Sequence, residues 1–497
     1  MYRNKVIFAS LLLVLISVAG CRTNLLNGSE TPEVPAQQAP PPAPVSVDGV
    51  RTSYADVVER TSPAVVRILS EHKERASTQP QLSPFGDDDF FRSLPRQNQR
   101  PQIERGIGSG VIVSADGTIM TNAHVIDEAE KITVMTSDNK TFDAKLVGSD
   151  KPSDLAVLKI EAQNMPYLTL GNSDTVRVGD IVLAIGNPLG IGQTVTAGII
   201  SAKGRRTGLS DGSFEDFLQT DAPINRGNSG GALVNLNAEL IGINSQILSS
   251  PGSAGGNIGI GFSIPSNMAR SVMEQLLQHG KVRRGMLGVN IQNITADTAQ
   301  ALELKDTTGV LVSNVKGGSA ADKAGVKRGD IITAINGEKI EDSNVLRNKV
   351  ASTLPGTEIR LTVLRDGNTQ ELTATLDEFD TTSAGADPQK NGGDQNNGAE
   401  RQSQNGKLGL SLQPVTPQVA RQLGLASESE GLVVTDVDSD GAAAEAGIAR
   451  GDVLLEVNRQ PVNATADVQA ALERGDSKPV LLLISRKGQT LYLTVKP

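Results

Sequence analysis

Three residues in this sequence have the types and the chain order that catalysis by a serine nucleophile requires. Ser229 lies in "DAPINRGNSGGALVN", a crowd of small residues that turns abruptly apolar. A serine hydroxyl is a weak nucleophile, so it needs an adjacent base, and the base needs a third group to fix its tautomer. His124 in "TIMTNAHVI" can serve as the base and Asp154 in "SDLAVLKI" as the third group. Together they predict an acyl-transfer site.

The base is chosen from only three histidines. His72 opens a polar insertion and His279 follows a predicted helix, so each is most simply a solvated surface residue. His124 ends a β-rich run at a corner of small residues. Alone, such a histidine is more typical of packing than of catalysis. Its combination with Asp154 and Ser229 favours the catalytic interpretation.

The acid is also a choice among candidates. Asp154 stands just before a strongly apolar run, which places its carboxylate at the mouth of a buried strand. The alternative interpretation of this position is a residue that caps a turn. Asp174 and Asp180 are the nearby competitors. Both lie in polar turns, "GNSD" and "RVGD", which need turn-forming residues in any case. Asp154 is therefore the predicted orienting acid.

The small residues around Ser229 have a predicted task. If the chain curls tightly, the backbone N–H groups of Gly227 and Ser229 can aim at one point, as an oxyanion hole requires. Asn228 tolerates the left-handed conformation that such a curl can use. Gly230 and Gly231 are expected to leave space for a substrate backbone beside the hydroxyl.

Two other motifs with glycine and serine fit this stretch less well. A phosphate-binding loop needs a lysine and opens a helix, whereas no lysine follows here and "GALVNLNAELIGIN" alternates like a hairpin. Gly227 to Gly231 satisfies the Gly-x-Ser-x-Gly elbow of esterases and lipases literally. That elbow belongs to a parallel sheet with histidine last in the chain, whereas histidine comes first here.

The elements that must position these residues are short strands. From Tyr54 to about Gln278, β-branched runs alternate with Gly, Asp or Asn turns, which predicts a β-barrel or sandwich. Residues 71–105 break the pattern with Pro, Asp, Gln and Arg and read as a long insertion. Residues 266–278 predict a closing helix, with Ser266 or Asn267 as its cap and its apolar side formed by Met268, Val272, Leu276 and Leu277.

The composition excludes several classes of protein. A formal net charge of −9 argues against nucleic acid as the main partner, because phosphate binding needs a basic face. One cysteine and three scattered histidines cannot make a zinc cluster, so no metal and no other cofactor is expected. The length of 497 residues exceeds what one core supports and predicts about three domains.

Residues 1–20 have the features of an export signal. Arg3 and Lys5 precede an apolar run over residues 6–18, which is short for a membrane span, with a short anchor as the alternative. The following "VAGC" resembles a bacterial lipoprotein cleavage box, in which Cys21 would be lipidated; ordinary cleavage nearby is the alternative. Residues 21–50 are rich in Pro, Ala, Gln and Thr and predict a disordered tether.

The last part of the chain contains an internal repeat. "GVLVSNVKGGSAADKAGVKRGDIITAIN" begins at Gly309, and "GLVVTDVDSDGAAAEAGIARGDVLLEVN" begins at Gly431. The two keep Ala-Gly-x-x-Arg-Gly-Asp in register, which identifies two copies of one module. The stretch rich in Gly, Asn, Gln and Asp between them predicts a linker.

These motifs, in the order histidine, aspartate, serine and then two repeats, resemble the HtrA/Deg family of periplasmic serine endoproteases. The resemblance runs from Tyr54 to Pro497 and implies a mainly β fold, with a chymotrypsin-like double β-barrel protease domain followed by two PDZ domains. The implied boundaries are 1–20 for a lipoprotein-type signal, 21–50 for the tether, 51–279 for the protease domain with a regulatory loop at about 71–105, 280–378 for PDZ domain 1, 379–405 for the linker and 406–497 for PDZ domain 2.

The resemblance also implies roles for individual residues. It places the catalytic triad on His124, Asp154 and Ser229, and the oxyanion hole on the turn of Gly227, Asn228 and Ser229. The "GMLGV" segment of the first PDZ domain is implied as the binding loop for peptides with a free carboxylate, by residues Gly285, Met286, Leu287, Gly288 and Val289. The matching "GKLGL" at 406–410 is equally well explained as a glycine turn that opens a strand.

Two functions follow from this comparison. The first is an ATP-independent serine endopeptidase of the periplasm of a Gram-negative bacterium, which degrades misfolded or unfolded envelope proteins and has possible chaperone activity. The implied partners are unfolded proteins, C-terminal peptides and other copies of the chain in a trimer and larger assemblies, with membrane association through a lipidated Cys21. The alternative is a PDZ-based holdase that binds exposed C-termini, with incidental proteolysis.

Overall fold

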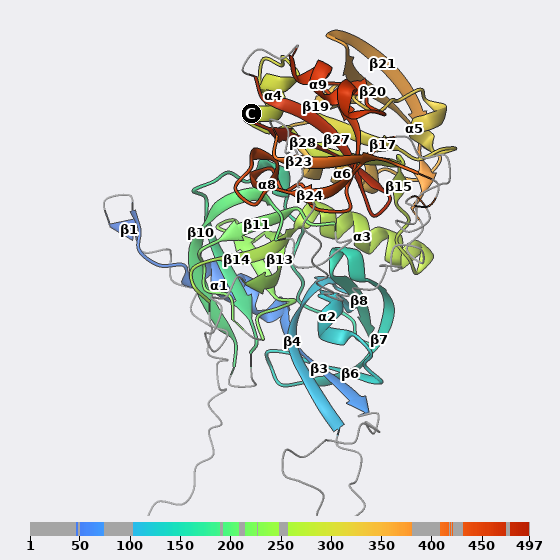
Figure 1. Ribbon diagram of the computed structural model, residues 1–497. Coiled ribbons are helices and arrows are strands. Elements are labelled where there is room, and N and C mark those ends of the chain that lie inside the picture. Colours follow the sequence, from blue (N-terminus) through green and yellow to red (C-terminus); the bar gives the residue numbers. More distant parts are fainter. Residues whose placement is uncertain are drawn as a thin grey trace, which may run out of the picture. The chain divides into compact units, whose positions relative to one another are not determined.

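A computed structural model describes most of the chain downstream of residue 50 (Figure 1). The described residues are 46–47, 50–73, 103–188, 192–207, 214–225, 227–247, 257–379, 408–416, 418, 420, 431–473 and 478–496. The predicted signal with Cys21 and the predicted linker, apart from its first residue Phe379, lie outside them. The chain divides into two compact units, residues 1–56 and 57–497.

The first unit contains a small β-ladder. Strands β1 (Ser46–Val47) and β2 (Val50–Arg51) pair antiparallel. The Arg51 guanidinium lies 5.7 Å from the centre of the Tyr54 ring. The prediction of a disordered tether over 21–50 is therefore wrong for residues 46, 47 and 50, which lie in paired strands.

The second unit begins with a closed six-stranded barrel in the order β3-β4-β5-β8-β7-β6 (Figure 1). Its strands are β3 (Val65–Lys73), β4 (Ile103–Ser114), β5 (Thr118–Thr121), β6 (Lys131–Met135), β7 (Thr141–Asp150) and β8 (Leu155–Ile160). Residues 71–73 and 103–105, which were predicted as parts of the insertion, instead pair with each other at the ends of β3 and β4. The mostly polar residue types of these two stretches gave no strand signal in the sequence.

A second closed barrel follows in the order β10-β11-β14-β13-β12-β9. Its strands are β9 (Ile181–Gly186), β10 (Thr194–Arg205), β11 (Phe217–Thr220), β12 (Ala232–Asn235), β13 (Leu240–Ile247) and β14 (Gly261–Pro265). The hairpin predicted from "GALVNLNAELIGIN" is the antiparallel pair β12 and β13. The mainly β double barrel is confirmed.

Short helices precede the first barrel strand or lie between later strands. They are α1 (Ala55–Thr61), η1 (Ser62–Ala64), α2 (Ala123–Ile126), η3 (Lys151–Ser153) and η4 (Ser173–Thr175). Helix α3 (Ser266–His279) closes the domain as predicted.

Two details predicted for α3 are wrong. Ser266 is the first helical residue, after Pro265, and its hydroxyl donates to the Gly171 carbonyl at 2.8 Å instead of capping the helix. Leu276 is buried, but the side chain of Leu277 is 47% exposed. Adjacent helix residues point about 100° apart, so only one of this pair can face the barrel.

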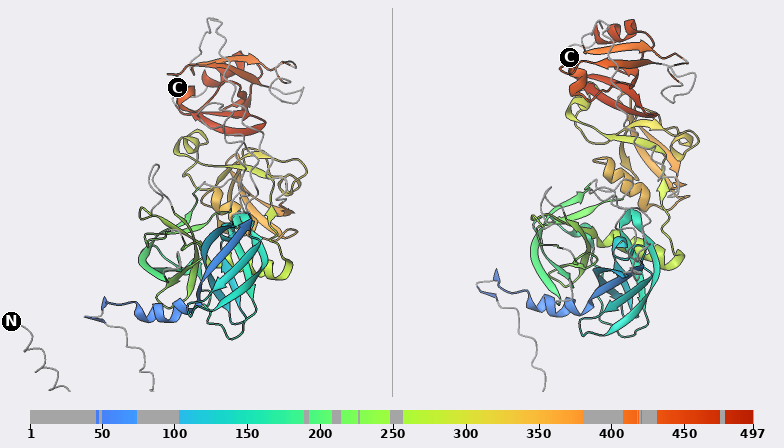
Figure 2. Two further views of the ribbon diagram at one scale, coloured as in Figure 1. Left: turned by 90° about the horizontal axis from the view of Figure 1, so that it is seen from below. Right: turned by 60° about the horizontal axis from the view of Figure 1, so that its bottom comes forward.

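The two repeats form two separate sheets (Figure 2). The order of corresponding strands is the same in both sheets. The first repeat comprises β15 (Gly285–Met286), β16 (Val289–Asn293), α4 (Ala296–Ala301), β17 (Val310–Val315), α5 (Ala320–Lys323), β18 (Ile331–Ile335), β19 (Glu338–Lys339), α6 (Ser343–Ser352), β20 (Glu358–Arg365), β21 (Asn368–Thr375) and β22 (Asp377–Glu378). The second comprises β23 (Leu410–Pro414), β24 (Leu432–Val437), α8 (Ala442–Glu445), β25 (Val453–Val457), β26 (Gln460–Pro461), α9 (Thr465–Glu473), β27 (Val480–Arg486) and β28 (Gln489–Val495).

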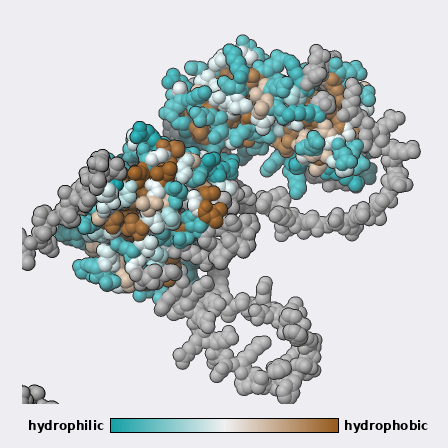
Figure 3. Space-filling view, turned by 90° about the vertical axis from the view of Figure 1, so that its left-hand side faces the viewer, coloured by the Kyte–Doolittle hydropathy of each residue, from teal (hydrophilic) through white to brown (hydrophobic). Residues whose placement is uncertain are grey.

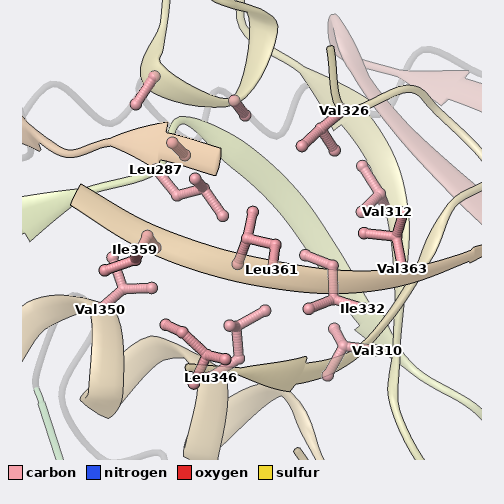
Figure 4. Packing of buried hydrophobic residues seen from close by; sticks show 14 of the residues in the cluster. Leu287, Val310, Val312, Val326, Ile332, Leu346, Val350, Ile359, Leu361 and Val363 are labelled. Carbon is pink, nitrogen blue, oxygen red and sulfur yellow. The ribbon is translucent and has the colours of Figure 1, made fainter. Parts of the chain in front are cut away.

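Each repeat has its own apolar core, and the two share a further cluster. Leu287, Leu346 and Leu361 belong to the core of the first repeat (Figure 4). The shared cluster combines residues of the first repeat with residues of the second, namely Ile294, Ala299, Leu311 and Ile331 with Leu481, Leu483 and Tyr492. Since side chains alternate along a strand, both sheets are buried on both faces where they meet.

Some apolar side chains remain at the surface. On the face seen in Figure 3 they gather in patches separated by polar residues. Val178 and Ile181 are 62% and 38% exposed, and Ile199, which is paired with Ile181 across the strands β9 and β10, is 39% exposed. In the part of the chain that the structure describes, no helix is long and apolar enough to cross a membrane.

Candidate functional site

His124 and Asp154 are brought together by neighbouring strands of the first barrel. β5 and β8 pair through Thr121 and Ala156, so the residues that follow one strand and precede the other lie side by side. His124 Nδ1 is 2.9 Å from both carboxylate oxygens of Asp154, and the His124 backbone N–H donates to Oδ1 at 3.1 Å. A carboxylate on Nδ1 fixes the tautomer that leaves Nε2 free to accept a proton.

Asp154 owes its direction to an unusual backbone conformation. It ends η3 with φ 54° and ψ 43°, in the left-handed region that an aspartate adopts more readily than most residues. The turn before it is fixed by Asp150, whose carboxylate accepts from the Ser153 N–H at 3.1 Å. The turn position that the sequence indicated for Asp154 and its contact with His124 therefore occur at the same residue.

Ser229 lies in the loop that enters β12. Its carbonyl accepts from the Ser109 N–H at 2.8 Å, which ties this loop to β4 of the other barrel. Its hydroxyl donates to the Ser245 carbonyl at 2.9 Å. Among the residues that the structure describes, this is its hydrogen-bond partner, so the hydroxyl must turn away from Ser245 before it can donate to His124.

Ser245 is a site residue that the sequence reading missed. Its hydroxyl donates to Asp154 Oδ2 at 2.7 Å. The register between β13 and β14 shifts between Asn244 and Gln246, so Ser245 stands at a bulge and its carbonyl is free of the ladder. The sequence signal was the run of polar residues from Asn244 to Gln246 within the otherwise apolar strand "LIGINSQI".

The glycines beside Ser229 act differently from the prediction. Positive φ occurs at Gly227 (95°) and Gly230 (82°), so the left-handed role predicted for Asn228 is wrong. A Cβ on Gly230 would lie 2.1 Å from the Ser109 carbonyl oxygen, and one on Gly231 would lie 2.2 Å from the Ile185 carbonyl oxygen. Both glycines admit neighbouring barrel backbone, rather than a substrate.

Some backbone groups of the turn that was predicted to form the oxyanion hole already make hydrogen bonds within the protein. The Asn228 N–H donates to the Asn225 carbonyl at 3.0 Å, which removes it as a donor to a ligand. The Gly227 carbonyl accepts from the Ser109 hydroxyl at 2.6 Å, and this bond fixes the orientation of the peptide that follows Gly227. Gly227 and Ser229 remain the two candidates for oxyanion donors.

The other two histidines belong to different elements. His72 lies in β3, where its Nε2 is 3.3 Å from the Ser70 hydroxyl. His279 ends α3 and is exposed. In the described residues, no group of three or more His, Cys, Asp or Glu side chains is arranged to hold a metal ion.

A buried ion pair joins the turn before Asp154 to the start of the first repeat. Arg284 donates to both carboxylate oxygens of Asp150, at 2.7 and 2.5 Å, and both side chains are almost fully buried. The Arg284 guanidinium also lies 4.7 Å from the centre of the Phe214 ring. Arg284 directly precedes the predicted peptide-binding loop, so this loop and the turn of Asp154 share one anchor.

The segment 214–217 connects the site with the first repeat. The Glu215 carboxylate accepts from the Thr207 N–H at 2.6 Å, and the Glu215 carbonyl accepts from the side chains of Asn344 and Asn348 in α6 at 3.0 and 2.9 Å. Burial raises the pKa of the neighbouring Asp216, and the nearby Asp174 carboxylate raises it further.

The predicted peptide-binding loop lies at the edge of the first repeat. Gly285 and Met286 pair with β22, and Leu287 is buried in the core. Gly288 has φ 81°, and Val289 opens β16, the strand at the end of its sheet. The N–H groups after the glycine and the edge of β16 are therefore placed where an extended peptide can add as a strand.

Comparisons with known proteins match this architecture. Family models match residues 108–243 as a trypsin-like peptidase domain, and residues 285–376 and 399–485 as PDZ domains. A probable periplasmic serine endoprotease of Chlamydia pneumoniae, described as DegP-like, is 40% identical over 469 residues, 92% of each chain. The periplasmic pH-dependent serine endoprotease DegQ of Escherichia coli (strain K12) is 41% identical over 465 residues, 92% of this chain and 94% of DegQ.

A solved structure is similar as well. The HtrA-type protease AlgW with a tripeptide is 43% identical and superposes with a TM-score of 0.54, which covers 66% of this chain and 98% of AlgW. The two PDZ domains implied by the family resemblance are confirmed by these matches.

Proposed function

This chain is a member of the HtrA/Deg family of periplasmic serine endoproteases, and on that premise we propose that His124, Asp154 and Ser229 carry its hydrolysis of peptide bonds. The observation that supports the proposal most strongly is the contact between His124 Nδ1 and Asp154 at 2.9 Å, made beside the loop that presents Ser229. It supplies an oriented base within the same site as a nucleophile.

The proposed mechanism follows from these positions. Ser229 Oγ attacks the substrate carbonyl carbon while its proton passes to His124 Nε2, and the negative charge that develops on the carbonyl oxygen is met by the N–H groups of Gly227 and Ser229. His124 then gives the proton to the departing amine as the C–N bond breaks. A water molecule repeats the sequence on the acyl-enzyme and regenerates the Ser229 hydroxyl.

The proposed substrates are unfolded or misfolded envelope proteins, cleaved without ATP. Residues 285–289 bind the C-terminal carboxylate of a peptide, which adds as a strand to the edge of β16. Among the strands that the structure describes, β16 stands at the end of its sheet, and this position supports the role. It also supports a second candidate, a holdase that retains unfolded chains through the same edge, and this would give the chain its chaperone activity.

The proposed assembly is a homotrimer that can build larger particles. The exposed apolar residues Val178, Ile181 and Ile199 give one surface for such contacts. We assign the protease domain to residues 51–279, the PDZ domains to 280–378 and 406–497, and lipid attachment to Cys21 behind the signal 1–20.

Degradation of unfolded casein tests the function. The wild-type chain is expected to cleave casein, and Ser229→Ala is expected to be inactive with an unchanged circular dichroism spectrum. The holdase is measured in Ser229→Ala by its suppression of the aggregation of a denatured protein. If wild type and Ser229→Ala cleave casein at the same rate, Ser229 is not the nucleophile.

A further inference from the structure

A fully buried serine, Ser109 in β4, lies where the first barrel contacts the loop that presents Ser229. The proposed mechanism gives this serine no role. A Cβ on the preceding residue, Gly108, would lie 2.5 Å from Cγ1 of Val125, which follows His124 in α2. This part of β4 therefore packs against the short helix of the base as well as against the loop of the nucleophile.

The direction of the Ser109 hydroxyl is determined by its two partners. Its oxygen accepts from the Asn187 N–H at 2.8 Å, at the residue that follows β9 of the second barrel. Its proton goes to the Gly227 carbonyl, 2.6 Å away. A backbone N–H can only donate and a carbonyl can only accept, so no other assignment of these two bonds is possible. One side chain of the first barrel thus joins two segments of the second.

The backbone of Ser109 holds the other side of the nucleophile. Its N–H donates to the Ser229 carbonyl at 2.8 Å. Ser109 therefore binds the carbonyls of both Gly227 and Ser229, the two residues whose N–H groups are the candidate oxyanion donors. Its own carbonyl accepts from the hydroxyl of Thr121 at 2.7 Å, and Thr121 ends β5, the strand that leads to His124. Ser109 thus connects the segments that carry the base, the nucleophile and the candidate oxyanion donors.

The peptide between Gly227 and Asn228 depends on its hydrogen bonds for its orientation. Its carbonyl is held by Ser109, and its N–H donates to the Asn225 carbonyl at 3.0 Å. Gly227 has φ 95°, and a glycine, which has no Cβ, is less restricted by steric contacts than any other residue. This peptide lies between the two candidate donors, so its plane sets the angle between their N–H groups.

We propose that Ser109 is a positioning residue for the oxyanion hole. Its hydroxyl holds the peptide that follows Gly227, so that the N–H groups of Gly227 and Ser229 point to the same oxygen. Because Ser109 is fully buried, it acts without touching the substrate. The inference rests on the proposed protease function and adds a residue to it. The positioned donors meet a charge that develops only in the transition state, so loss of the hydroxyl should lower kcat and leave KM nearly unchanged.

The experiment uses the full chain, a quenched fluorescent peptide that contains a casein cleavage site, and two inhibitors with the sequence on the amino side of that site. One inhibitor is a peptide aldehyde and the other is the matching alcohol. Ser229 Oγ adds to the aldehyde carbon, its proton passes to His124, and the charge rests on the former carbonyl oxygen. The alcohol has no carbonyl and forms no such adduct.

Ser109→Ala is expected to lower kcat about 10- to 100-fold, between the effects of a small misplacement and of a lost donor. It should weaken binding of the aldehyde by a similar factor, whereas the affinity for the alcohol stays within about twofold of wild type. Ser266→Ala is the matched control, because Ser266 is equally buried and its hydroxyl donates to the Gly171 carbonyl at 2.8 Å. It should lower the melting temperature as Ser109→Ala does, with the kcat and both inhibitor affinities of wild type.

Ser109→Thr keeps the hydroxyl and is expected to keep the ratio of the two inhibitor affinities, and it decides the question if Ser109→Ala does not fold. Wild-type kcat in Ser109→Ala, or equal weakening of the aldehyde and the alcohol, would refute the positioning role. Loss of the affinity ratio in folded Ser109→Thr would refute it as well. Equal cleavage by wild type and Ser229→Ala would instead refute the proposed function.

Discussion

At the scale of single residues, Ser245 has the most consequences for catalysis. Its hydroxyl holds Asp154, and its carbonyl holds the Ser229 hydroxyl. A hydrogen bond to a charged group contributes about 1.5–3 kcal/mol. If that energy serves to orient His124, Ser245→Ala should lower kcat about 10- to 100-fold. KM is expected to change little, because the carbonyl remains.

Steady-state kinetics on one peptide substrate measures this effect. Ser245→Thr keeps the hydroxyl and should recover most of the activity, which a purely structural role would not predict. A loss of activity that follows the melting temperature, and not the presence of the hydroxyl, would contradict the positioning role.

Asp216 provides a pH-dependent prediction. Its carboxyl is faced by Asp174, Lys203, Asp342 and Lys349, and burial raises its pKa above the usual 3.8. The folded state therefore holds this proton more tightly than the unfolded state. This contribution to stability is complete below 3.8 and is lost as the pH rises through the folded-state pKa. Asp216→Asn, which stays neutral, should melt above wild type at about pH 7, and the gap should close near pH 4.

Asp138 is the control with the opposite sign. Hydrogen bonds from Thr136 and Lys140 lower its pKa to about 2, so its carboxylate stabilises the fold above 3.8 and loses this effect as the pH falls through about 2. Asp138→Asn should melt below wild type at about pH 7. Melting curves of both variants at several pH values test the pair. If the melting temperatures of both variants differed from wild type in the same direction at each pH, the net charge of the chain, and not these two local environments, would determine the effect.

The contact between His124 and Asp154 could be predicted because residue type and chain order point to the chemistry that they would share with Ser229. The same reasoning could not find Ser245, since its role arises from a bulge that forms only when β13 pairs with β14. The same reasoning also predicted, wrongly, that Gly230 and Gly231 leave space for a substrate. Their space is filled by barrel backbone that is distant in the sequence. Local patterns predict which groups react, whereas the contacts that hold them depend on long-range pairing.

At the scale of elements, the buried pair of Asp150 and Arg284 connects β7, η3 and the start of the first PDZ domain. Removing one partner of a buried, bidentate pair leaves an uncompensated charge, which costs about 3–5 kcal/mol. Arg284→Ala should therefore destabilise the chain by that amount. It should also lower kcat, because the Asp150 carboxylate would no longer be fixed before the turn of Asp154.

Denaturant unfolding and peptide kinetics check both effects. Asp150→Asn combined with Arg284→Met removes both charges and should regain part of the stability, since two neutral groups carry a smaller desolvation cost. A double variant as unstable as Arg284→Ala would show that the ion pair itself, and not the unpaired charge, matters.

At the scale of the whole molecule, the repeat made two similar domains predictable, but not the cluster between them. The β27 segment "VLLLISR" is apolar at consecutive positions, which is typical of a strand buried on both faces. Leu482 faces the core of its own domain, and Leu483 faces the shared cluster. The pattern indicated a second buried face. The pattern could not indicate which surface covers this second face of β27, because the covering residues belong to the other PDZ domain.

This pair of neighbouring leucines gives the last prediction, on the coupling of the two PDZ domains. Both are fully buried, so Leu→Val at either position removes one methylene and costs roughly 1 kcal/mol. Leu483→Val weakens the contact that opening of the first domain must break. Exchange of the backbone amides in β17 and β18 should therefore rise about fivefold. Leu482→Val weakens only the core of the second domain, so those amides should exchange as in the wild type while amides of β25 and β27 exchange faster. If the amides of β17 exchanged at the same rate in both variants, the two domains would open independently. Coupling through the shared cluster predicts faster exchange of these amides in Leu483→Val than in Leu482→Val.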